Sequence, residues 1–308
     1  MNEIYQKTLS TEVSFRGIGL HSGKNSIINI IPAKENEGIV FKRVDLSKNN
    51  LIKADFNYVS SAKLCTTLEN NHGVKVSTVE HLLAALYIKG IDNAIVEIDN
   101  EEVPIMDGSS KDFLAVLENT SLIDQTKKRK YLKISKKIEL IDGNRRISIE
   151  PNNSSLEVSF QLNYENKIIG KQKNVIDFQT DKLEEVFSSR TFCLYEDIEK
   201  IKKFGLAKGG SLDNAVVVDK DKVLNEGGLR NKKEFVNHKI LDLAGDFLLS
   251  GYRIIGKVAC YQGGHELTNL FLRKLFSKKI AFQVVELKDF NVSKKFHSKE
   301  LDKIAVNA

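Results

Sequence analysis

The residues with the clearest potential for chemistry lie in the stretch FVNHKILDLAGDFLLSG, residues 235–251. His238 and Asp242 are four residues apart, so in a helix both side chains can reach one point above the same face. An imidazole nitrogen and a carboxylate oxygen at that spacing suit a metal ion. Lys239 and Asp246 share this polar face, opposite an apolar arc. The alternative is a solvent-exposed helix face that carries an ordinary histidine–aspartate pair.

A second pair, Glu80 and His81, opens the apolar run HLLAALYI. An imidazole without a partner is costly in such a helix, and the positive helix N-terminus favours the neutral form that binds metal. The alternative makes His81 a core histidine and lets Glu80 close a capping box with Ser77. The spacing is not the HExxH signature, so a zincin-type peptidase is not predicted.

His265, in GGHELTN, lies between an expected strand and a helix N-terminus, and its alternative is a turn residue without a role. Taken together, His81, His238 and Asp242 form a two-histidine, one-carboxylate set, and three protein ligands with one open position are typical of catalytic zinc. Glu80 is then available as a base and His265 as an acid. Asp246 could orient His265, and Lys239 could meet a phosphate.

The elements that must position these residues occur twice along the chain. Each copy consists of two strands joined by a turn, a helix that runs into glycine and a strand, and a further helix. The copies are expected over residues 25–45, 77–99 and 107–118, and again over 144–164, 237–262 and 263–276. Aligning Gly90 with Gly251 sets His81 against Asp242. Residues 119–130 are expected to be a polar linker, and 194–225 an insertion in the second copy.

Composition restricts the setting in which this site works. The 308 residues suggest two domains, and 41% hydrophobic with 29% charged residues is ordinary for a globular protein. The N-terminus has no apolar signal region, and the longest apolar run is too short to cross a bilayer. Three cysteines far apart indicate a reducing compartment. We therefore expect a cytoplasmic protein without membrane insertion.

Several strings resemble one family in order and spacing, from about residue 3 to the C-terminal region. They are VEHLLAAL, EVPIMDGSS, SRTF, GGSLDNAVVVD, NHKILDLAGD and GGHELTN. This set is similar to that of the UDP-3-O-acyl-N-acetylglucosamine deacetylases, zinc amidases of bacterial lipid A synthesis. The resemblance implies an α+β fold of two β-α-α-β domains like the second domain of ribosomal protein S5, with helices between two sheets. The domains would be 1–125 and 126–308, with the site at their interface.

The resemblance also implies a role for each site residue. Zinc would be held by His81, His238 and Asp242, although Fe(II) also suits two histidines and a carboxylate. Glu80 would activate water, His265 with its partner Asp246 would protonate the leaving amine, and Thr191 would donate its hydroxyl to the oxyanion. The implied substrate contacts are Phe192 at the sugar, Lys239 at the diphosphate, Tyr164 at the uracil, Cys65 near the site, and an acyl-chain tunnel lined by Ile198, Ala207, Gly210, Ser211, Ala215 and Val217.

Two further features bear on the resemblance. Gln262 stands where a lysine is expected. If phosphate binding draws on a lysine there, this protein must supply it from another residue or bind UDP less tightly. The final residues, IAVNA (304–308), resemble a degradation tail, and a frayed terminus is the simpler interpretation.

The sequence leaves two rival functions open. One is a deacetylase for an N-acetyl amino sugar that lacks the acyl chain. The other is a nucleic-acid-binding module, suggested by the S5-like topology and a net charge of +6. The lysines are dispersed and not interleaved with aromatic residues, which argues against nucleic acid. We expect a monomer that binds UDP-3-O-acyl-GlcNAc and no nucleic acid.

Overall fold

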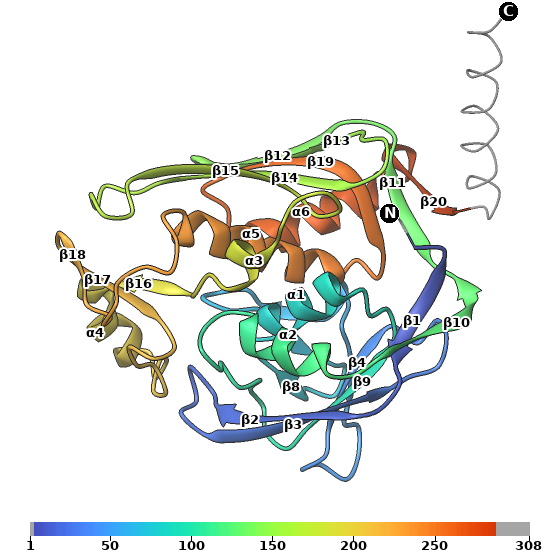
Figure 1. Cartoon of the computed structure of the whole chain (residues 1–308), viewed down its shortest axis with the longest axis horizontal. Coiled ribbons are helices and arrows are strands. Elements are labelled where there is room, and N and C mark those ends of the chain that lie inside the picture. The colour runs from blue at the N-terminus through green and yellow to red at the C-terminus, as the bar shows by residue number, and fades with distance from the viewer. Residues whose placement is uncertain (1–2, 288–308) are drawn as a thin grey trace, which may run out of the picture.

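A layer of helices lies between two β-sheets in the computed structural model, which describes residues 3–287 (Figure 1). The N-terminal half supplies the lower sheet in this view, and the C-terminal half supplies the upper one. The architecture is mixed α and β, which agrees with the expected α+β class. Residues 304–308, which resemble a degradation tail, lie outside the described residues.

The N-terminal half builds a five-stranded sheet. In spatial order its strands are β2 (Val13–Ile18), β3 (Asn25–Pro32), β9 (Ala94–Ile98), β4 (Ile39–Arg43) and β5 (Leu51–Lys53). A small antiparallel sheet beside it contains β6 (Val59–Ser61), β7 (Thr67–Glu69) and β8 (Lys75–Val76).

The C-terminal half builds a seven-stranded sheet. Its strands are β12 (Ile138–Asp142), β13 (Arg145–Glu150), β19 (Arg253–Tyr261), β14 (Leu156–Asn163), β15 (Lys171–Asp177), β11 (Lys130–Ile134) and β20 (Phe282–Glu286). In β14 every second side chain is buried, so one face of the strand packs on the helices.

The two sheets share one pattern of strand pairing. β9 runs antiparallel to β3 and parallel to β4, and β19 runs antiparallel to β13 and parallel to β14. The expected hairpins over 25–45 and 144–164 are therefore wrong, because a later strand lies between the two members of each pair. Alternating hydrophobicity shows that a strand has one buried face, but it does not identify its neighbour.

The helices are α1 (Glu80–Lys89), α2 (Lys111–Glu118), α3 (Glu184–Phe187), α4 (Tyr195–Lys203), α5 (Glu234–Leu248) and α6 (His265–Ser277), with single 3₁₀ turns η1 (Phe56–Tyr58) and η2 (Lys279–Ala281). α1 and α5 pack against each other at the centre (Figure 1). α1 ends at Gly90, whose φ of +87° is a left-handed conformation that glycine adopts without strain.

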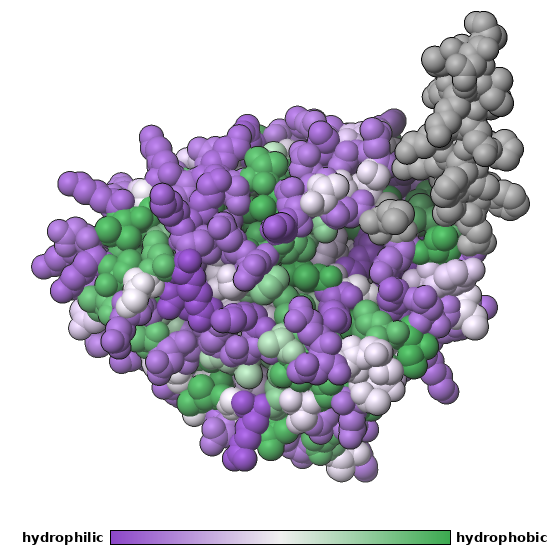
Figure 2. Space-filling view, viewed as in Figure 1, coloured by the Kyte–Doolittle hydropathy of each residue, from purple (hydrophilic) through white to green (hydrophobic). Residues whose placement is uncertain are grey.

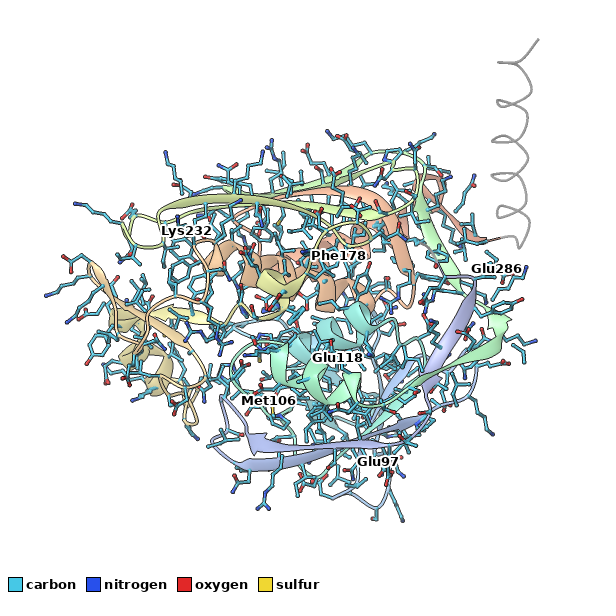
Figure 3. The ribbon with its side chains drawn as sticks, in the orientation of Figure 1. Glu97, Met106, Glu118, Phe178, Lys232 and Glu286 are labelled. Carbon is cyan, nitrogen blue, oxygen red and sulfur yellow. The ribbon has the colours of Figure 1, made fainter. Side chains whose placement is uncertain are left out.

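Side chains from the C-terminal half also contact α1 near its end. Arg253 of β19 donates hydrogen bonds to the carbonyl oxygens of Tyr87 and, at 3.1 Å, of Ile91. Phe178, labelled in Figure 3, packs edge-on against Tyr87 with ring centroids 5.5 Å apart. These contacts join the two halves on the side of the helix layer away from the N-terminus of α1.

The structure contradicts one expectation and one alternative interpretation of the polar segments. Residues 119–130 contain the strand β10 (Leu122–Lys128), which pairs antiparallel with β1 (Tyr5–Leu9), so the segment is not an irregular linker. The polar composition of this segment did not indicate a strand, because the strand is defined by the pairing of its backbone groups with β1. The polar face of α5 is not solvent-exposed either, since Lys239 is the one residue of this helix that is not buried.

The expected insertion over 194–225 forms a projecting subdomain, at the left of Figure 1. It contains α4, β17 (Val216–Asp219) and β18 (Lys222–Val223), and its sheet also includes β16 (Phe192–Leu194), which begins just before the insertion. No helix within residues 3–287 is long and apolar enough to cross a membrane.

Candidate metal centre and active site

Three side chains of metal-ligand type meet where the first turn of α1 faces α5. His81 comes from α1, and His238 and Asp242 come from α5, with one ligand atom of each within 4.8 Å of the others. The Nε2 atoms of His238 and His81 lie 3.3 and 3.5 Å from Asp242 Oδ1. The structure thus brings together the three residues that the sequence singled out as metal ligands.

A backbone carbonyl sets the orientation of His238. Its Nδ1 donates a hydrogen bond to the carbonyl oxygen of Ser189 at 3.0 Å. This places the proton on Nδ1 and leaves the lone pair of Nε2 directed at Asp242, as in metal-ligating histidines. Burial lowers the pKa of His238 to about 3, so the imidazole is neutral at physiological pH and able to ligate.

The donor set fits a divalent cation. Within residues 3–287, Asp242 Oδ1 is a buried oxygen without a hydrogen-bond partner. A buried carboxylate oxygen left unpaired costs free energy, and a cation between it and the two imidazoles would remove that cost. Two imidazoles and one carboxylate leave a coordination position open, which is typical of catalytic zinc.

Glu80 and His265 face each other beside these ligands. His265 Nε2 lies 3.6 Å from Glu80 Oε1, and its Nδ1 donates to Asp246 Oδ2 at 2.8 Å. Burial raises the pKa of Glu80. Burial alone would lower the pKa of His265, but the carboxylates of Asp246, Glu80 and Asp242 outweigh it and raise the value to about 10. A carboxylate and a protonated imidazole so placed can act as a base and an acid.

Thr66 contacts Glu80 and also Asp246, the partner of His265, and sequence reasoning missed it. Its backbone N–H donates to Glu80 Oε2 at 3.0 Å, and its hydroxyl donates to Asp246 Oδ1 at 2.7 Å. The capping box proposed as the alternative for Glu80 is therefore wrong, and no side chain caps the helix at Val79. The contact of Glu80 with the loop residue Thr66 replaces the local capping-box contact that the sequence pattern suggested.

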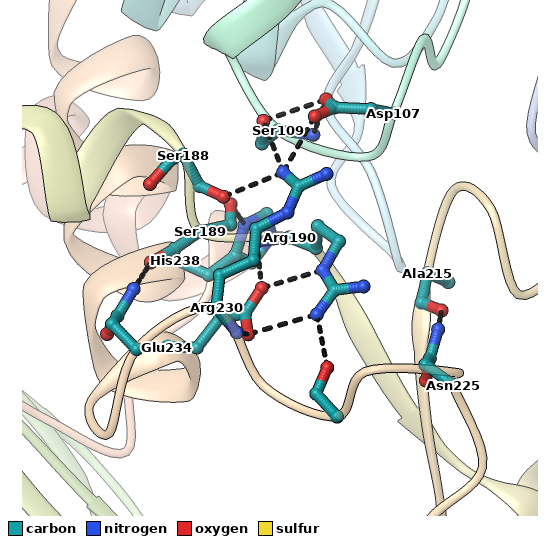
Figure 4. Close-up of polar contacts among 12 residues, drawn as sticks. Asp107, Ser109, Ser188, Ser189, Arg190, Ala215, Asn225, Arg230, Glu234 and His238 are labelled. Carbon is teal, nitrogen blue, oxygen red and sulfur yellow. Dashed lines mark hydrogen bonds and ion pairs between the residues drawn. The ribbon is translucent and has the colours of Figure 1, made fainter.

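A buried ion pair anchors the SRTF segment, as Figure 4 shows. Glu234, at the start of α5, is fully buried and accepts from the Arg190 side chain at 2.8 Å and from the Arg230 backbone N–H at 2.7 Å. This pairing fixes the chain on either side of Arg190. Ser189 then presents its carbonyl to His238, and the backbone N–H of Thr191 donates to the carbonyl oxygen of Gly108 at 2.8 Å.

Aromatic rings form a wall beside the ligands. Phe192 packs edge-on against Tyr164 at 6.0 Å and against Phe235 at 4.9 Å, and it lies 6.3 Å from the ring of His238. Lys239 Nζ lies 5.6 Å from the centroid of Phe192 and donates to Asp242 Oδ2 at 2.8 Å. Tyr164, Phe192 and Lys239, which the resemblance assigned to the substrate, therefore line one side of the site.

An apolar cavity of about 370 Å³ opens in the projecting subdomain beside Thr191 and Phe192. The six residues expected to line an acyl tunnel all border it, namely Ile198, Ala207, Gly210, Ser211, Ala215 and Val217. Sequence reasoning missed His21, which also borders it. Ala207 N–H donates to His21 Nδ1 at 3.4 Å, and the buried Nε2 has no partner among the described residues.

Two other residues singled out in the sequence have local roles. Cys65 is buried beside Glu80, and burial together with that charge raises the pKa of its thiol to about 12. Gln262 pairs with the backbone of Asn163. Its side-chain amide accepts from the backbone N–H of Asn163 at 2.9 Å and donates to the carbonyl of the same residue at 2.5 Å.

Comparison with known proteins supports one family. The profile of the family "UDP-3-O-acyl N-acetylglycosamine deacetylase" matches residues 6–277. Proteins named "UDP-3-O-acyl-N-acetylglucosamine deacetylase" from Saccharophagus degradans and Shewanella frigidimarina are 42% and 41% identical, over 94% and 92% of this chain and 96% and 93% of their own. One from Haemophilus ducreyi is 38% identical over 93% of this chain and 94% of its own. The chain belongs to the UDP-3-O-acyl N-acetylglycosamine deacetylase family.

Proposed function

We propose that this protein hydrolyses the N-acetyl group of UDP-3-O-acyl-GlcNAc, releasing acetate and the free amine, as a step of lipid A biosynthesis. Its relatives carry the name of this activity. The observation that carries the proposal is the buried set of His81, His238 and Asp242, placed next to the facing pair Glu80 and His265.

The reaction needs a base, an acid and a donor to the oxyanion. Glu80 accepts a proton from water as the water oxygen adds to the amide carbonyl carbon. The hydroxyl of Thr191 donates to the oxygen that gains negative charge. The C–N bond then breaks as His265 Nε2 gives its proton to the amine nitrogen, and Asp246 orients the imidazole through Nδ1.

His81, His238 and Asp242 are the residues that would hold a metal ion in this mechanism. Bound zinc would polarise the amide carbonyl and lower the pKa of water to about 7. Fe(II) suits the same donors, so either ion is compatible with the proposal.

The remaining contacts determine the substrate. Lys239 would bind the diphosphate, Phe192 would lie against the sugar, Tyr164 would stack on the uracil, and Cys65 would lie near the reacting group. The acyl chain would occupy the 370 Å³ cavity, whose largely apolar lining suits a hydrocarbon. An amphiphile is thus favoured over an amino sugar without the chain.

The finer expectations about architecture and setting stay proposals. The repeated strand pattern supports two β-α-α-β domains like the second domain of ribosomal protein S5, over 1–125 and 126–308. We also propose that the protein acts as a monomer in the cytoplasm and binds no nucleic acid.

Metal content and turnover, measured together on anaerobically purified protein, test the proposal. A chelator should abolish hydrolysis, and zinc or Fe(II) should restore it. His238→Ala should lose both metal and activity, whereas His265→Ala should keep the metal and lose most activity. Equal metal loss in both variants would reject these roles.

Two further assays test the rival functions. Equal turnover of UDP-GlcNAc and its 3-O-acyl form would favour the amino-sugar deacetylase. Salt-dependent RNA binding that ignores the chelator, without hydrolysis, would favour the nucleic-acid module.

A further inference from the structure

Exposed apolar side chains gather around the apolar cavity of the projecting subdomain. Leu64, Tyr195 and Leu212 border the apolar cavity there and are 50%, 55% and 45% exposed. Phe204 directly follows α4 and is 75% exposed. No residue of α4 is buried. Grouped apolar side chains that stay in water mark an interaction surface, since each of them gains free energy when covered.

Lysines lie around Phe204. Lys63 Nζ lies 5.4 Å from the centroid of Phe204, and the last turn of α4 carries Lys200, Lys202 and Lys203. Acidic residues of the helix are Glu196 and Asp197 in its first turn and Glu199, and Asp197 pairs with Lys200 at 3.1 Å. The positive charge is therefore concentrated beside Phe204.

Figure 2 shows green side chains among purple ones at the left edge, over the subdomain that Figure 1 draws there. Aromatic and aliphatic groups flanked by lysines are typical of surfaces that rest in the interface of a bilayer. The apolar groups reach the boundary of the acyl chains, and the lysines pair with anionic headgroups.

We propose that the docking tip, made of Leu64, Tyr195, Phe204, Leu212 and the lysines Lys63, Lys200, Lys202 and Lys203, binds peripherally to an anionic lipid bilayer. A second copy of the chain is disfavoured as the partner, because two identical lysine-rich faces would repel each other. Since Leu64, Tyr195 and Leu212 border the cavity, docking would bring the cavity close to the acyl chains of the bilayer. The docking itself needs no substrate and does not depend on the proposed function.

Co-sedimentation of the full chain with vesicles tests the proposal without any substrate. The protein should bind vesicles of phosphatidylethanolamine with phosphatidylglycerol, bind pure phosphatidylcholine weakly, and dissociate as salt is raised. Phe204→Ser should weaken binding about fivefold, since only part of the ring becomes buried. Lys203→Gln should weaken binding to the anionic vesicles alone.

Ile280→Ser is the matched control. Ile280 is 74% exposed and also follows lysines, but it lies outside the docking tip, so this variant should bind vesicles like the unmodified protein. Circular dichroism and metal content should be unchanged in all variants. Failure to bind anionic vesicles, equal binding to neutral ones, or equal loss in Ile280→Ser would overturn the proposal. A dimer in sedimentation velocity that Phe204→Ser abolishes, without vesicle binding, would assign the tip to a second copy and overturn it too.

Discussion

Gly245 of α5 lies so close to α1 that a Cβ atom on it would come within 2.1 Å of the carbonyl oxygen of Glu80. Only glycine permits this approach, because the atoms it meets belong to backbone that cannot turn aside. The close crossing sets the distance between His81 on one helix and His238 and Asp242 on the other. The arrangement of the candidate metal ligands therefore depends on a residue with no side chain.

Replacing Gly245 with alanine tests this dependence. Helix propensity alone would make the variant about 1 kcal/mol more stable, whereas forcing the helices apart should destabilise it by about 1–3 kcal/mol. Metal affinity should fall as well, because His81 moves with α1. Urea unfolding of the metal-free protein and metal titration measure the two effects. A more stable variant with unchanged metal affinity would show that the helices separate without cost.

Thr66 is predicted to act on the reaction through Asp246 and His265. Thr66→Val keeps the shape of the side chain and removes the hydroxyl that donates to Asp246 at 2.7 Å. We expect kcat to fall about tenfold, in line with the loss of one hydrogen bond to a carboxylate, while metal content stays the same. Thr66→Ser restores a hydroxyl and should recover most of the activity. Loss of metal in Thr66→Val would instead mean that the hydroxyl supports the fold of the site.

The sequence predicted the three candidate metal ligands that the structure brings together, because their spacing is local or repeated. His238 and Asp242 share a helix face, and the repeat sets His81 opposite Asp242. The groups that orient the site residues could not be predicted from the sequence. The Ser189 carbonyl and the Thr66 hydroxyl come from loops whose positions depend on tertiary contacts far along the chain. Every residue has a backbone carbonyl, so the residue type at position 189 gives no sign that its carbonyl pairs with His238.

Strand order was the other part that could not be predicted. The alternation in 25–45 and 144–164 identifies strands correctly, but β9 and β19 lie between the members of each pair. β9 and β19 each follow a helix, α1 and α5, so the neighbour of each earlier strand comes much later in the chain, and nothing within the two earlier strands identifies it.

The charge of His265 should make the stability of the metal-free protein depend on pH. Its pKa is raised from 6.5 to about 10 by nearby carboxylates that outweigh burial. A raised pKa in the folded state stabilises the fold fully below about pH 6.5, and this contribution is lost as pH rises through about 10. The free energy of unfolding should therefore fall more steeply toward alkaline pH than in His265→Gln.

Urea unfolding with a chelator present, at several pH values between neutral and alkaline, measures that slope for both proteins. Lysines and cysteines titrate in both, so the difference between the slopes reports His265. Parallel slopes would mean that the imidazole is not held charged in the folded protein.

Gln262 is predicted to position Tyr164 without taking part in the chemistry. Its amide holds the backbone of Asn163 through two hydrogen bonds, and the next residue, Tyr164, packs against Phe192. Gln262→Ala removes both bonds, each contributing about 1 kcal/mol, and should loosen the aromatic wall. We expect KM to rise several-fold while kcat and metal content stay close to the original values.

Gln262→Glu and Gln262→Lys separate positioning from charge. A glutamate can still accept from Asn163 N–H but cannot donate to its carbonyl, so KM should rise to an intermediate value. A lysine loses the acceptor, so KM should rise if positioning dominates, whereas a lower KM would mean that a direct contact with the diphosphate outweighs the lost bonds. A fall in kcat with KM unchanged in Gln262→Ala would place this residue in the chemical step and contradict the positioning role.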